Sequence, residues 1–525
     1  MMHSSFFTLF SLFISYSSFV SAIPLPISIR GQETRRAEQT VLQERTGLTS
    51  TAGVGDIADL IYTVAIQLGN TTTQVILDTG SSDLWIKSDA CKTEQCDSSA
   101  STPYAMASAR LTGADVNLKF GDSTTGTHAS GPVVQDTVAL AGLSLPDQVF
   151  AAINDTDNNA ARQGTAGLIG FGFPSQSFVQ AAVVNKEFDT PPTTDAFVTS
   201  TAAYGPFLSR LAMSGQLAQP MFSVSFQRNV IDVSGNGNIT IGELPPGVDN
   251  SSITWVPVRL YHPNEGGQNP PTFAPNEVYP LRWEIPLDGV FLDGQKLPDT
   301  NLTGNVPSKQ LSALIDTGNS LIRGPKDVVN GILSSVSSKF AADQAARPIF
   351  PCATAHNLTF QIGGKMFPID PRDFVSAQKT GDATDCVADN VVTTDPPSIG
   401  ALYSWSLGDP FFKSNTVVFY YGNLTHPSSD PPRIGFISNV PQNANDLLQE
   451  AVSEAKSQGG VFESTQNLAP TASTTISVQP TSLAPFPTAT PKDRLASPSA
   501  SSSATSASAC RYSIFILPLL SYMLS

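Results

Sequence analysis

The sequence predicts a mostly β protein made of two lobes that are built on one plan. From about residue 61 to residue 440, short β-branched or aromatic runs alternate with Gly, Pro, Asn and Asp, which is typical of strands joined by turns. Long amphipathic helical patterns are few, and Pro206 to Leu217 is the main candidate. The chain has 525 residues, which is too many for a single compact core.

A duplicated motif is the first sign that the two lobes are related. Val75 to Ser82 and Ala313 to Ser320 each form an apolar run that ends in Asp-Thr-Gly and small polar residues. One Asp-Thr-Gly is a weak signal, because Asp and Gly are ordinary turn residues. Two copies that both follow apolar runs predict two strands that end in the same way.

The spacing downstream of the motif strengthens this interpretation. Gly170 lies 92 residues after Asp78, and Gly408 lies 92 residues after Asp316; each glycine ends a short apolar run. Two lobes with a common plan produce such equal spacings. The alternative is a pair of unrelated turn aspartates on separate β domains, which would match only by chance.

The two aspartates predict one shared catalytic site. A charged carboxylate at the end of a buried strand is costly when it stands alone. Two carboxyls that meet across a lobe interface share one proton, so one pKa rises, the other falls, and an acid lies beside a base. We therefore expect Asp78 and Asp316 to activate a water molecule. The supporting residues that we expect around them are Thr79, Gly80, Ser81, Thr317, Gly318 and Asn319.

Composition and charge exclude several other classes of function. The net charge is −15, with 29 Lys plus Arg against 44 Asp plus Glu, which argues against nucleic-acid binding. A low pI suits work in acid, although simple solubility explains it equally well. The chain contains neither G-x-S-x-G nor H-E-x-x-H, and its histidines have no metal-ligand spacing, so we expect no metal and no cofactor.

The N-terminal region is typical of a secreted precursor. Phe6 to Val20 is largely apolar and small residues follow, so residues 1–22 are predicted to be a cleaved signal peptide. Residues 23–50 are polar and are predicted to be a propeptide. The pair Arg35-Arg36 is either a processing point or an ordinary solvated charge pair.

The C-terminal region predicts a lipid anchor. Residues 441–501 are predicted to be a Ser/Thr/Pro-rich stalk with a short polar helix in 441–460, because a chain without large apolar residues cannot bury a core. The apolar run from Tyr512 to Leu524 is too short to span a bilayer. It matches a GPI-attachment signal with 502–525 removed. Ser501 is the expected anchor residue among the candidate positions Ser499 to Ser503, and an unprocessed tail is the alternative.

Secretion also permits disulfides and glycans. Cys91 and Cys96 can close a small loop, Cys352 and Cys386 can close a larger one, and Cys510 is left over. Seven Asn-x-Ser/Thr sequons are candidate glycosylation sites, at Asn70, Asn154, Asn238, Asn250, Asn301, Asn357 and Asn423.

From about residue 62 to residue 437 the chain resembles the pepsin-like aspartic proteases, peptidase A1. The resemblance rests on both Asp-Thr-Gly motifs, on residues 166–172 and on residues 405–412. It implies two pseudo-twofold β lobes (51–228 and 229–440) with a cleft between them, and a monomeric endopeptidase that cuts polypeptides in acid. The family commonly places disulfides at both Cys pairs. The signal, stalk and tail resemble the fungal GPI-anchored branch, which includes the yapsins, at the extracellular face of the membrane or in the wall.

The resemblance also implies a flap over the substrate and reveals three departures. The flap residues are expected at Phe120, Gly121 and Asp122, near Trp85. Phe120 replaces the usual Tyr, whose hydroxyl reaches the Trp position, while Asn319 replaces a Thr or Ser and Ala166 replaces an Asp. An Asn amide is able to donate, so Asn319 is expected to keep a supporting role with altered geometry. The alternative reading is a wall protein that keeps the fold without catalysis.

Overall fold

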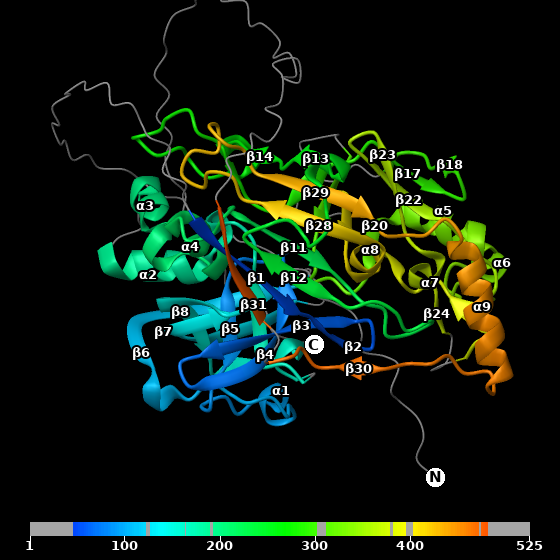
Figure 1. Cartoon of the computed structure of the whole chain (residues 1–525), viewed down its shortest axis with the longest axis horizontal. Coiled ribbons are helices and arrows are strands. Elements are labelled where there is room, and N and C mark those ends of the chain that lie inside the picture. Colours follow the sequence, from blue (N-terminus) through cyan, green and yellow to red (C-terminus); the bar gives the residue numbers. More distant parts are fainter. Residues whose placement is uncertain are drawn as a thin grey trace, which may run out of the picture. The chain divides into compact units, whose positions relative to one another are not determined.

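The structure is a computed structural model that describes the chain in eight stretches (Figure 1), namely residues 46–121, 126–162, 164–188, 193–301, 311–377, 382–394, 403–471 and 474–480. It is mostly β, with several sheets and few helices, which confirms the predicted fold class. The expected signal peptide, most of the propeptide, Asp122 and Ser501 lie outside the described residues.

The N-terminal half is built on a ten-stranded sheet, drawn mainly in blue and cyan in Figure 1. Residues along β6 alternate between exposed and buried, as expected for strands with one face on the core. Its strands are β2 (Gly55–Ile57), β3 (Ile61–Leu68), β4 (Thr71–Asp78), β5 (Leu84–Lys87), β6 (Arg110–Phe120), β7 (Thr127–Leu140), β8 (Leu143–Ile153), β9 (Asp155–Thr156), β10 (Gly167–Gly170) and β30 (Gln466–Asn467).

The C-terminal half repeats the central part of this arrangement. In the first half β10 runs parallel to β4 and places Gly170 opposite Asp78; in the second half β27 runs parallel to β19 in the same way. The duplicated motifs therefore correspond to duplicated strand pairs. The five-stranded sheet in this half has the order β16 (Glu284–Pro286), β19 (Ser312–Ile315), β27 (Trp405–Leu407), β20 (Ile322–Pro325) and β26 (Val391–Thr394). A four-stranded sheet has the order β18 (Gln295–Lys296), β17 (Gly289–Leu292), β22 (Leu358–Ile362) and β23 (Lys365–Pro368). Two smaller sheets are formed by β14 (Leu260–Tyr261) with β15 (Tyr279–Pro280), and by β21 (Ile349–Pro351), β25 (Asp385–Val387) and β24 (Ser376–Ala377).

A seven-stranded sheet combines strands from both halves. Its order is β13 (Thr254–Pro257), β29 (Arg433–Ser438), β28 (Asn415–Tyr420), β11 (Met221–Ser225), β12 (Asn238–Ile241), β1 (Thr46–Gly53) and β31 (Thr474–Pro480). Strand β1 extends past residue 50, where the propeptide is expected to end, so its first five residues belong to the expected propeptide. The expected lobe boundary at residue 228 falls between β11 and β12, which pair with each other.

Helices pack against the sheets. Helix α4 (Phe207–Ser214) occupies the predicted helical stretch, whereas α2 (Phe178–Phe188) and α3 (Thr194–Tyr204) were not predicted. Their valines, threonines and phenylalanines favour strands, and tertiary packing overrides that preference. The C-terminal half carries α5 (Lys326–Val336), α6 (Ser338–Ala342), α7 (Pro371–Phe374) and α8 (Asp409–Ser414).

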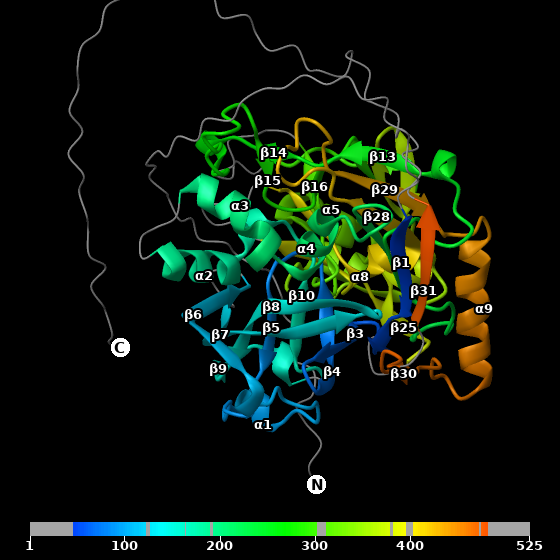
Figure 2. The ribbon, with the colours of Figure 1, turned by 60° about the vertical axis from the view of Figure 1, so that its left-hand side comes forward.

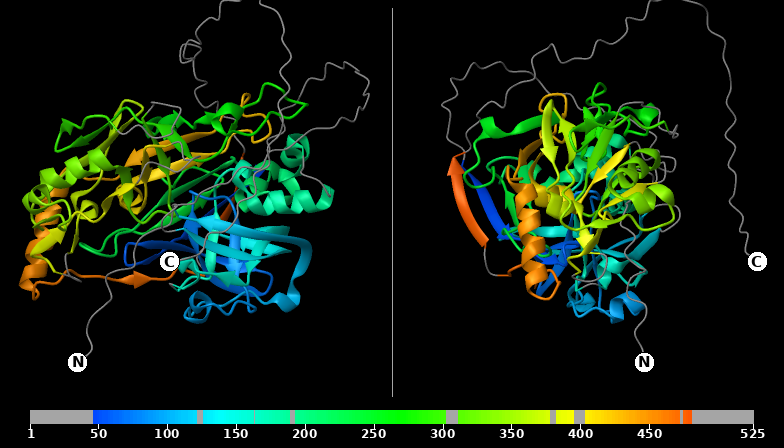
Figure 3. Two further views of the ribbon diagram at one scale, coloured as in Figure 1. Left: turned by 180° about the vertical axis from the view of Figure 1, so that it is seen from behind. Right: turned by 90° about the vertical axis from the view of Figure 1, so that its right-hand side faces the viewer.

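The segment after residue 440 differs from the expected stalk. Helix α9 (Ala444–Ser457) is the predicted short polar helix, and it buries Leu448, Val452 and Ala455 one turn apart on a single face. The chain then adds β30 to β2 and β31 to β1 (Figures 2 and 3). A Ser/Thr-rich segment is able to form a strand there, because backbone ladder hydrogen bonds need no apolar side chains.

Both predicted disulfides are present, Cys91–Cys96 and Cys352–Cys386. The sequon asparagines are exposed at Asn70, Asn154, Asn301 and Asn423 and partly exposed at Asn238, Asn250 and Asn357. No helix in the described part of the chain is long and apolar enough to cross a membrane.

Candidate active site

The two aspartates lie at the ends of equivalent buried strands. Asp78 is the last residue of β4, whose residues from Thr73 onward are all buried. Asp316 directly follows β19, whose four residues are buried as well. A short apolar run lies directly before each Asp, Val75 to Leu77 in β4 and Ala313 to Ile315 in β19, and the Asp-Thr-Gly turn follows where the halves meet.

The two motif threonines join the two loops by reciprocal hydrogen bonds. The Thr79 N–H donates to Thr317 Oγ1 at 2.9 Å, and the Thr317 N–H donates to Thr79 Oγ1 at 3.0 Å. Each hydroxyl then donates across the interface, from Thr79 to the Ile315 carbonyl and from Thr317 to the Leu77 carbonyl, both at 2.8 Å. The N–H and hydroxyl groups of both threonines are thus paired across the interface, so the loops are fixed to each other.

The motif glycines bring the two carboxyls close together. The Gly80 N–H donates to Asp78 Oδ1 at 2.8 Å, and the Gly318 N–H donates to Asp316 Oδ1 at 2.9 Å. A Cβ on Gly80 would lie 2.3 Å from Asp316 Oδ1, and a Cβ on Gly318 would lie 2.4 Å from Asp78 Oδ1. Each glycine therefore packs against the opposite carboxyl, at a distance that a larger residue would not allow.

Burial and mutual repulsion set the proton affinity of the pair. Asp78 is 6% exposed and Asp316 is 4% exposed. Burial and the neighbouring Asp78 charge hold the pKa of Asp316 well above its usual value. Burial also raises the pKa of Asp78, but donors from Ser81 and Gly80 oppose the rise. The two carboxyls therefore form a coupled pair, and the Ser81 and Gly80 donors favour negative charge on the Asp78 side of it.

The position after each Asp-Thr-Gly differs between the halves. The Ser81 hydroxyl donates to Asp78 Oδ2. The Asn319 amide instead donates to Ser406 Oγ at 2.9 Å, and its backbone N–H bonds the carbonyl of Asp316 at 3.3 Å. The Asn319 amide is therefore turned toward β27 and does not bond the Asp316 carboxyl, so the expected support from Asn319 takes an altered geometry, through Ser406 and the Asp316 backbone.

A buried arginine belongs to the site and was not foreseen. Arg323 lies in β20 and is 7% exposed; its Nε donates to Asn319 Oδ1 at 3.3 Å. Its positive charge opposes the rise in the pKa of Asp316. The sequence contains one sign of this role. Arg323 is a charged residue inside an otherwise apolar segment, four positions after Asn319, and buried cations are rare without a partner.

The flap strand packs Phe120 against Trp85. Their ring centroids are 5.9 Å apart, and the Trp85 Nε1–H is buried without a hydrogen-bond partner among the described residues. The polar link that a Tyr would provide is thus missing, as expected from the sequence. Gly121 follows Phe120 with a positive φ of 85°, which ends the strand at a turn.

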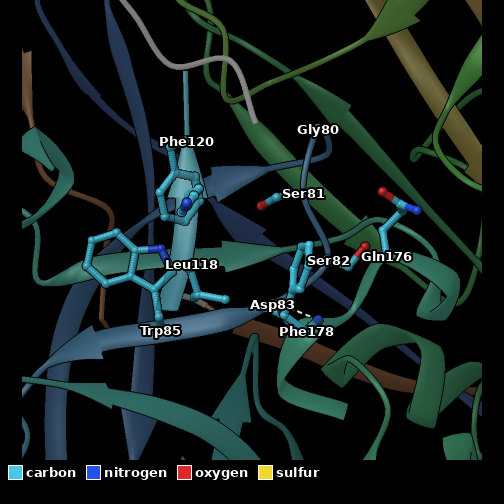
Figure 4. A pocket seen from close by; sticks show the side chains of 10 residues that line it. Gly80, Ser81, Ser82, Asp83, Trp85, Leu118, Phe120, Gln176 and Phe178 are labelled. Carbon is cyan, nitrogen blue, oxygen red and sulfur yellow. Dashed lines mark hydrogen bonds between the residues drawn. The ribbon is translucent and has the colours of Figure 1, made fainter. Parts of the chain in front are cut away.

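A pocket lies between the flap and the Asp78 loop (Figure 4), and Figure 4 shows Trp85 and Phe120 on one side of it and Gln176 on the other. Asp83 at its base accepts hydrogen bonds from Ser177 Oγ at 2.5 Å and from the Phe178 N–H at 2.8 Å, at the start of α2. Burial raises the pKa of Asp83 to about 6. The pocket residues are Gly80, Ser81, Ser82, Asp83, Trp85, Leu118, Lys119, Phe120, Gln176 and Phe178.

Comparison with known proteins agrees with this geometry. The sequence model of the family "Eukaryotic aspartyl protease" matches residues 61–426. The chain is 25% identical over 435 residues to "Major aspartyl peptidase 1" of Cryptococcus neoformans, covering 78% of this chain and 77% of the relative. It is 24% identical over 390 residues to "Aspartic protease" of Phaffia rhodozyma (73% and 77%) and 26% identical over 355 residues to "Pepsin A" of Sus scrofa (66% and 75%). The chain therefore belongs to the eukaryotic aspartyl protease family and is an aspartic peptidase, a hydrolase.

Proposed function

We propose that the chain is an endopeptidase that hydrolyses internal peptide bonds of polypeptides at acid pH, with Asp78 and Asp316 as its catalytic residues. The observation that carries this proposal is the pair of buried carboxyls, held face to face by the Thr79–Thr317 hydrogen bonds. Acid pH is required because the pair works with one shared proton, which is lost as the pH rises.

In the proposed mechanism, a water molecule lies between the two carboxyls. The Asp78 carboxylate takes one proton from this water while the water oxygen bonds to the carbonyl carbon of the peptide. Protonated Asp316 gives its proton to the carbonyl oxygen, which leaves a neutral tetrahedral diol. The carbon–nitrogen bond then breaks, the amine leaves with a proton from Asp78, and Asp316 regains a proton from the diol.

Proteolysis by the purified secreted chain tests this proposal. The chain with its processed N-terminus is incubated with a denatured protein at pH 4 and at pH 7.5, with and without pepstatin, a transition-state mimic for this class. We expect cleavage at pH 4 that pepstatin blocks, and little cleavage at pH 7.5. Absence of cleavage in every condition would favour the non-catalytic wall protein instead.

We also propose that the protein is secreted and held at the cell surface by a GPI anchor on Ser501. The support is the combination of an N-terminal apolar segment, a Ser/Thr/Pro-rich region and a terminal apolar tail. Treatment of intact cells with phosphatidylinositol-specific phospholipase C is expected to release the protein. Retention after treatment, with a known anchored protein released in parallel, would contradict the anchor.

A further inference from the structure

Several polar side chains that line the pocket between the flap and the Asp78 loop already have hydrogen-bond partners within the protein. Ser81 is engaged with Asp78, and Ser82 donates to the Phe173 carbonyl at 2.7 Å. Asp83 is engaged with Ser177 and with the first turn of α2. We therefore do not expect these three side chains to determine which substrate residue the pocket binds.

Three polar side chains remain without a strong partner in the described part of the chain. Lys119 is exposed and forms no ion pair there. The Gln176 amide makes only a 3.3 Å bond to the Ser175 carbonyl, and its oxygen is buried and unpaired. The Trp85 N–H is buried and unpaired as well. The walls between them, formed by Leu118, Phe120 and Phe178, are apolar.

The other charged groups near Lys119 are mostly acidic. His128 lies opposite Lys119 in the β6–β7 register, and its ring nitrogens lie 3.2 Å from Asp155 and 3.0 Å from Asp157, so two carboxylates share one imidazole. Asp115 is exposed on β6, four residues before Lys119. Helix α2, which packs against β6, carries the exposed Lys186 and Glu187. Lys186 lies beside Gly113, which is six residues from Lys119 and therefore about 20 Å along the strand.

We propose that this pocket gives the enzyme a preference for glutamate at one position next to the scissile bond, with Lys119 as the residue that determines it. A glutamate side chain has a two-carbon stem for the apolar walls and a carboxylate that accepts from the Lys119 ammonium and the Gln176 amide. The pocket adjoins the reacting centre, because Gly80 and Ser81 line it and also bond Asp78. This inference rests on the proposed endopeptidase function.

The test compares glutamate with glutamine, which has the same shape, in matched peptides. Each of the four residues that flank one scissile bond is in turn Glu or Gln, and kcat/KM is measured from pH 3 to pH 5.5. Glutamate ionises in this range, with an ordinary pKa of about 4.3. Asp83, with a pKa of about 6, stays largely protonated over most of this range and adds little charge to the pocket. The Glu/Gln ratio also cancels the pH dependence of the catalytic pair.

At one position we expect the Glu/Gln ratio to rise from about 1 at pH 3 to about 2–5 at pH 5.5, as for other exposed ion pairs. The rise should vanish in Lys119→Gln and persist in Lys119→Arg. It should also persist in Lys186→Gln, which removes an equal charge from the far end of β6. A flat ratio at all four positions, or an unchanged rise in Lys119→Gln, would overturn the proposal.

The experiment gives a different result if the proposed endopeptidase function is wrong. A chain that cleaves none of the peptides contradicts the endopeptidase function itself. The pocket is then judged by equilibrium binding of the same peptides, for which the same Glu/Gln ratio is expected in the unaltered chain and a ratio of about 1 in Lys119→Gln. A binding ratio that does not depend on Lys119 would overturn the assignment of the pocket.

Discussion

The Asp78 half and the Asp316 half of the active site share their backbone geometry but surround their carboxyls differently. In both halves a buried strand ends at the Asp, a glycine N–H bonds one carboxyl oxygen, and a threonine bonds across the interface. Among the described residues, Asp78 alone also accepts from a hydroxyl, that of Ser81, whereas the equivalent Asn319 faces Ser406. The backbone thus brings the acids together, and the side chains make the surroundings of the two carboxyls unequal.

Substitution of the motif glycines tests the shared part of this comparison and should have the largest effect among the residues around the two carboxyls. Gly80→Ala and Gly318→Ala each place a Cβ against the opposite carboxyl. We expect each to lower kcat/KM by about 100-fold or more, because a displacement of about 1 Å in the reacting groups has that cost. The losses should be similar in the two variants. A large loss in one and none in the other would show that the halves are not equivalent.

Substitution of Ser81 and Asn319 tests the part that differs. Ser81→Ala removes a hydrogen bond to a carboxylate, so kcat/KM should fall about 10- to 100-fold. It should also raise the pKa of Asp78, which moves the acidic limb of the pH profile to higher pH.

Asn319→Ala should leave the acidic limb in place, because its amide does not bond either carboxyl, and should lower the thermal midpoint. Its oxygen accepts from Arg323, so the alkaline limb should move by less than it does in Arg323→Gln, where the charge itself is lost. A shifted acidic limb in Asn319→Ala would contradict the asymmetry.

Two buried carboxyls outside the Asp78–Asp316 pair, one in each half, allow the two halves to be compared in their contribution to stability. Burial raises the pKa of Asp56, in the N-terminal half, to about 9, and its Oδ2 has no partner among the described residues. Asp373, in the C-terminal half, is paired with Arg228 at 2.7 Å and with Lys413 at 3.4 Å; these cations lower its pKa to about 2 despite its burial.

The two groups predict opposite pH dependences. The contribution of Asp56 is complete below its unfolded pKa of about 4 and is lost as the pH rises toward 9; that of Asp373 is complete above about 4 and is lost as the pH falls toward 2. Stability should therefore be greatest near pH 4–5. Asp56→Asn should stabilise the protein by about 1–3 kcal/mol at pH 7 and much less at pH 4. Chemical denaturation at both pH values measures this; an equal effect at both would contradict the raised pKa.

Arg323 tests a smaller difference between the two halves, namely the positive charge near Asp316. Its charge lowers the pKa of Asp316, so Arg323→Gln should raise that pKa and move the alkaline limb of the profile up by about one pH unit. Arg323→Lys keeps the charge and is the matched control. The midpoint of thermal unfolding of each variant shows whether the fold is kept. An alkaline limb that stays in place in a folded Arg323→Gln would contradict the role of this charge.

The features of the fold that follow from repeated patterns along the chain were predictable from the sequence. The duplicated motif and its spacing predicted two related β halves, and the Cys positions matched the disulfides of the family. Sequence reasoning missed contacts set only by three-dimensional packing. Whether the Asn319 amide faces Asp316 or Ser406 depends on β27, which is about 90 residues away along the chain. The same reason explains β31, whose Ser/Thr-rich sequence gives no strand signal until β1 offers an unpaired edge.

The central claim is that Asp78 and Asp316 act as one unit around a single water molecule. The most direct test measures kcat/KM on one peptide for Asp78→Asn, for Asp316→Asn and for the double variant. We expect each single variant to lose about 1,000-fold or more, and the double variant to be no worse than either, because groups that act together are not additive. If either single variant keeps its activity, or if the two losses multiply in the double variant, the two carboxyls do not work as a pair.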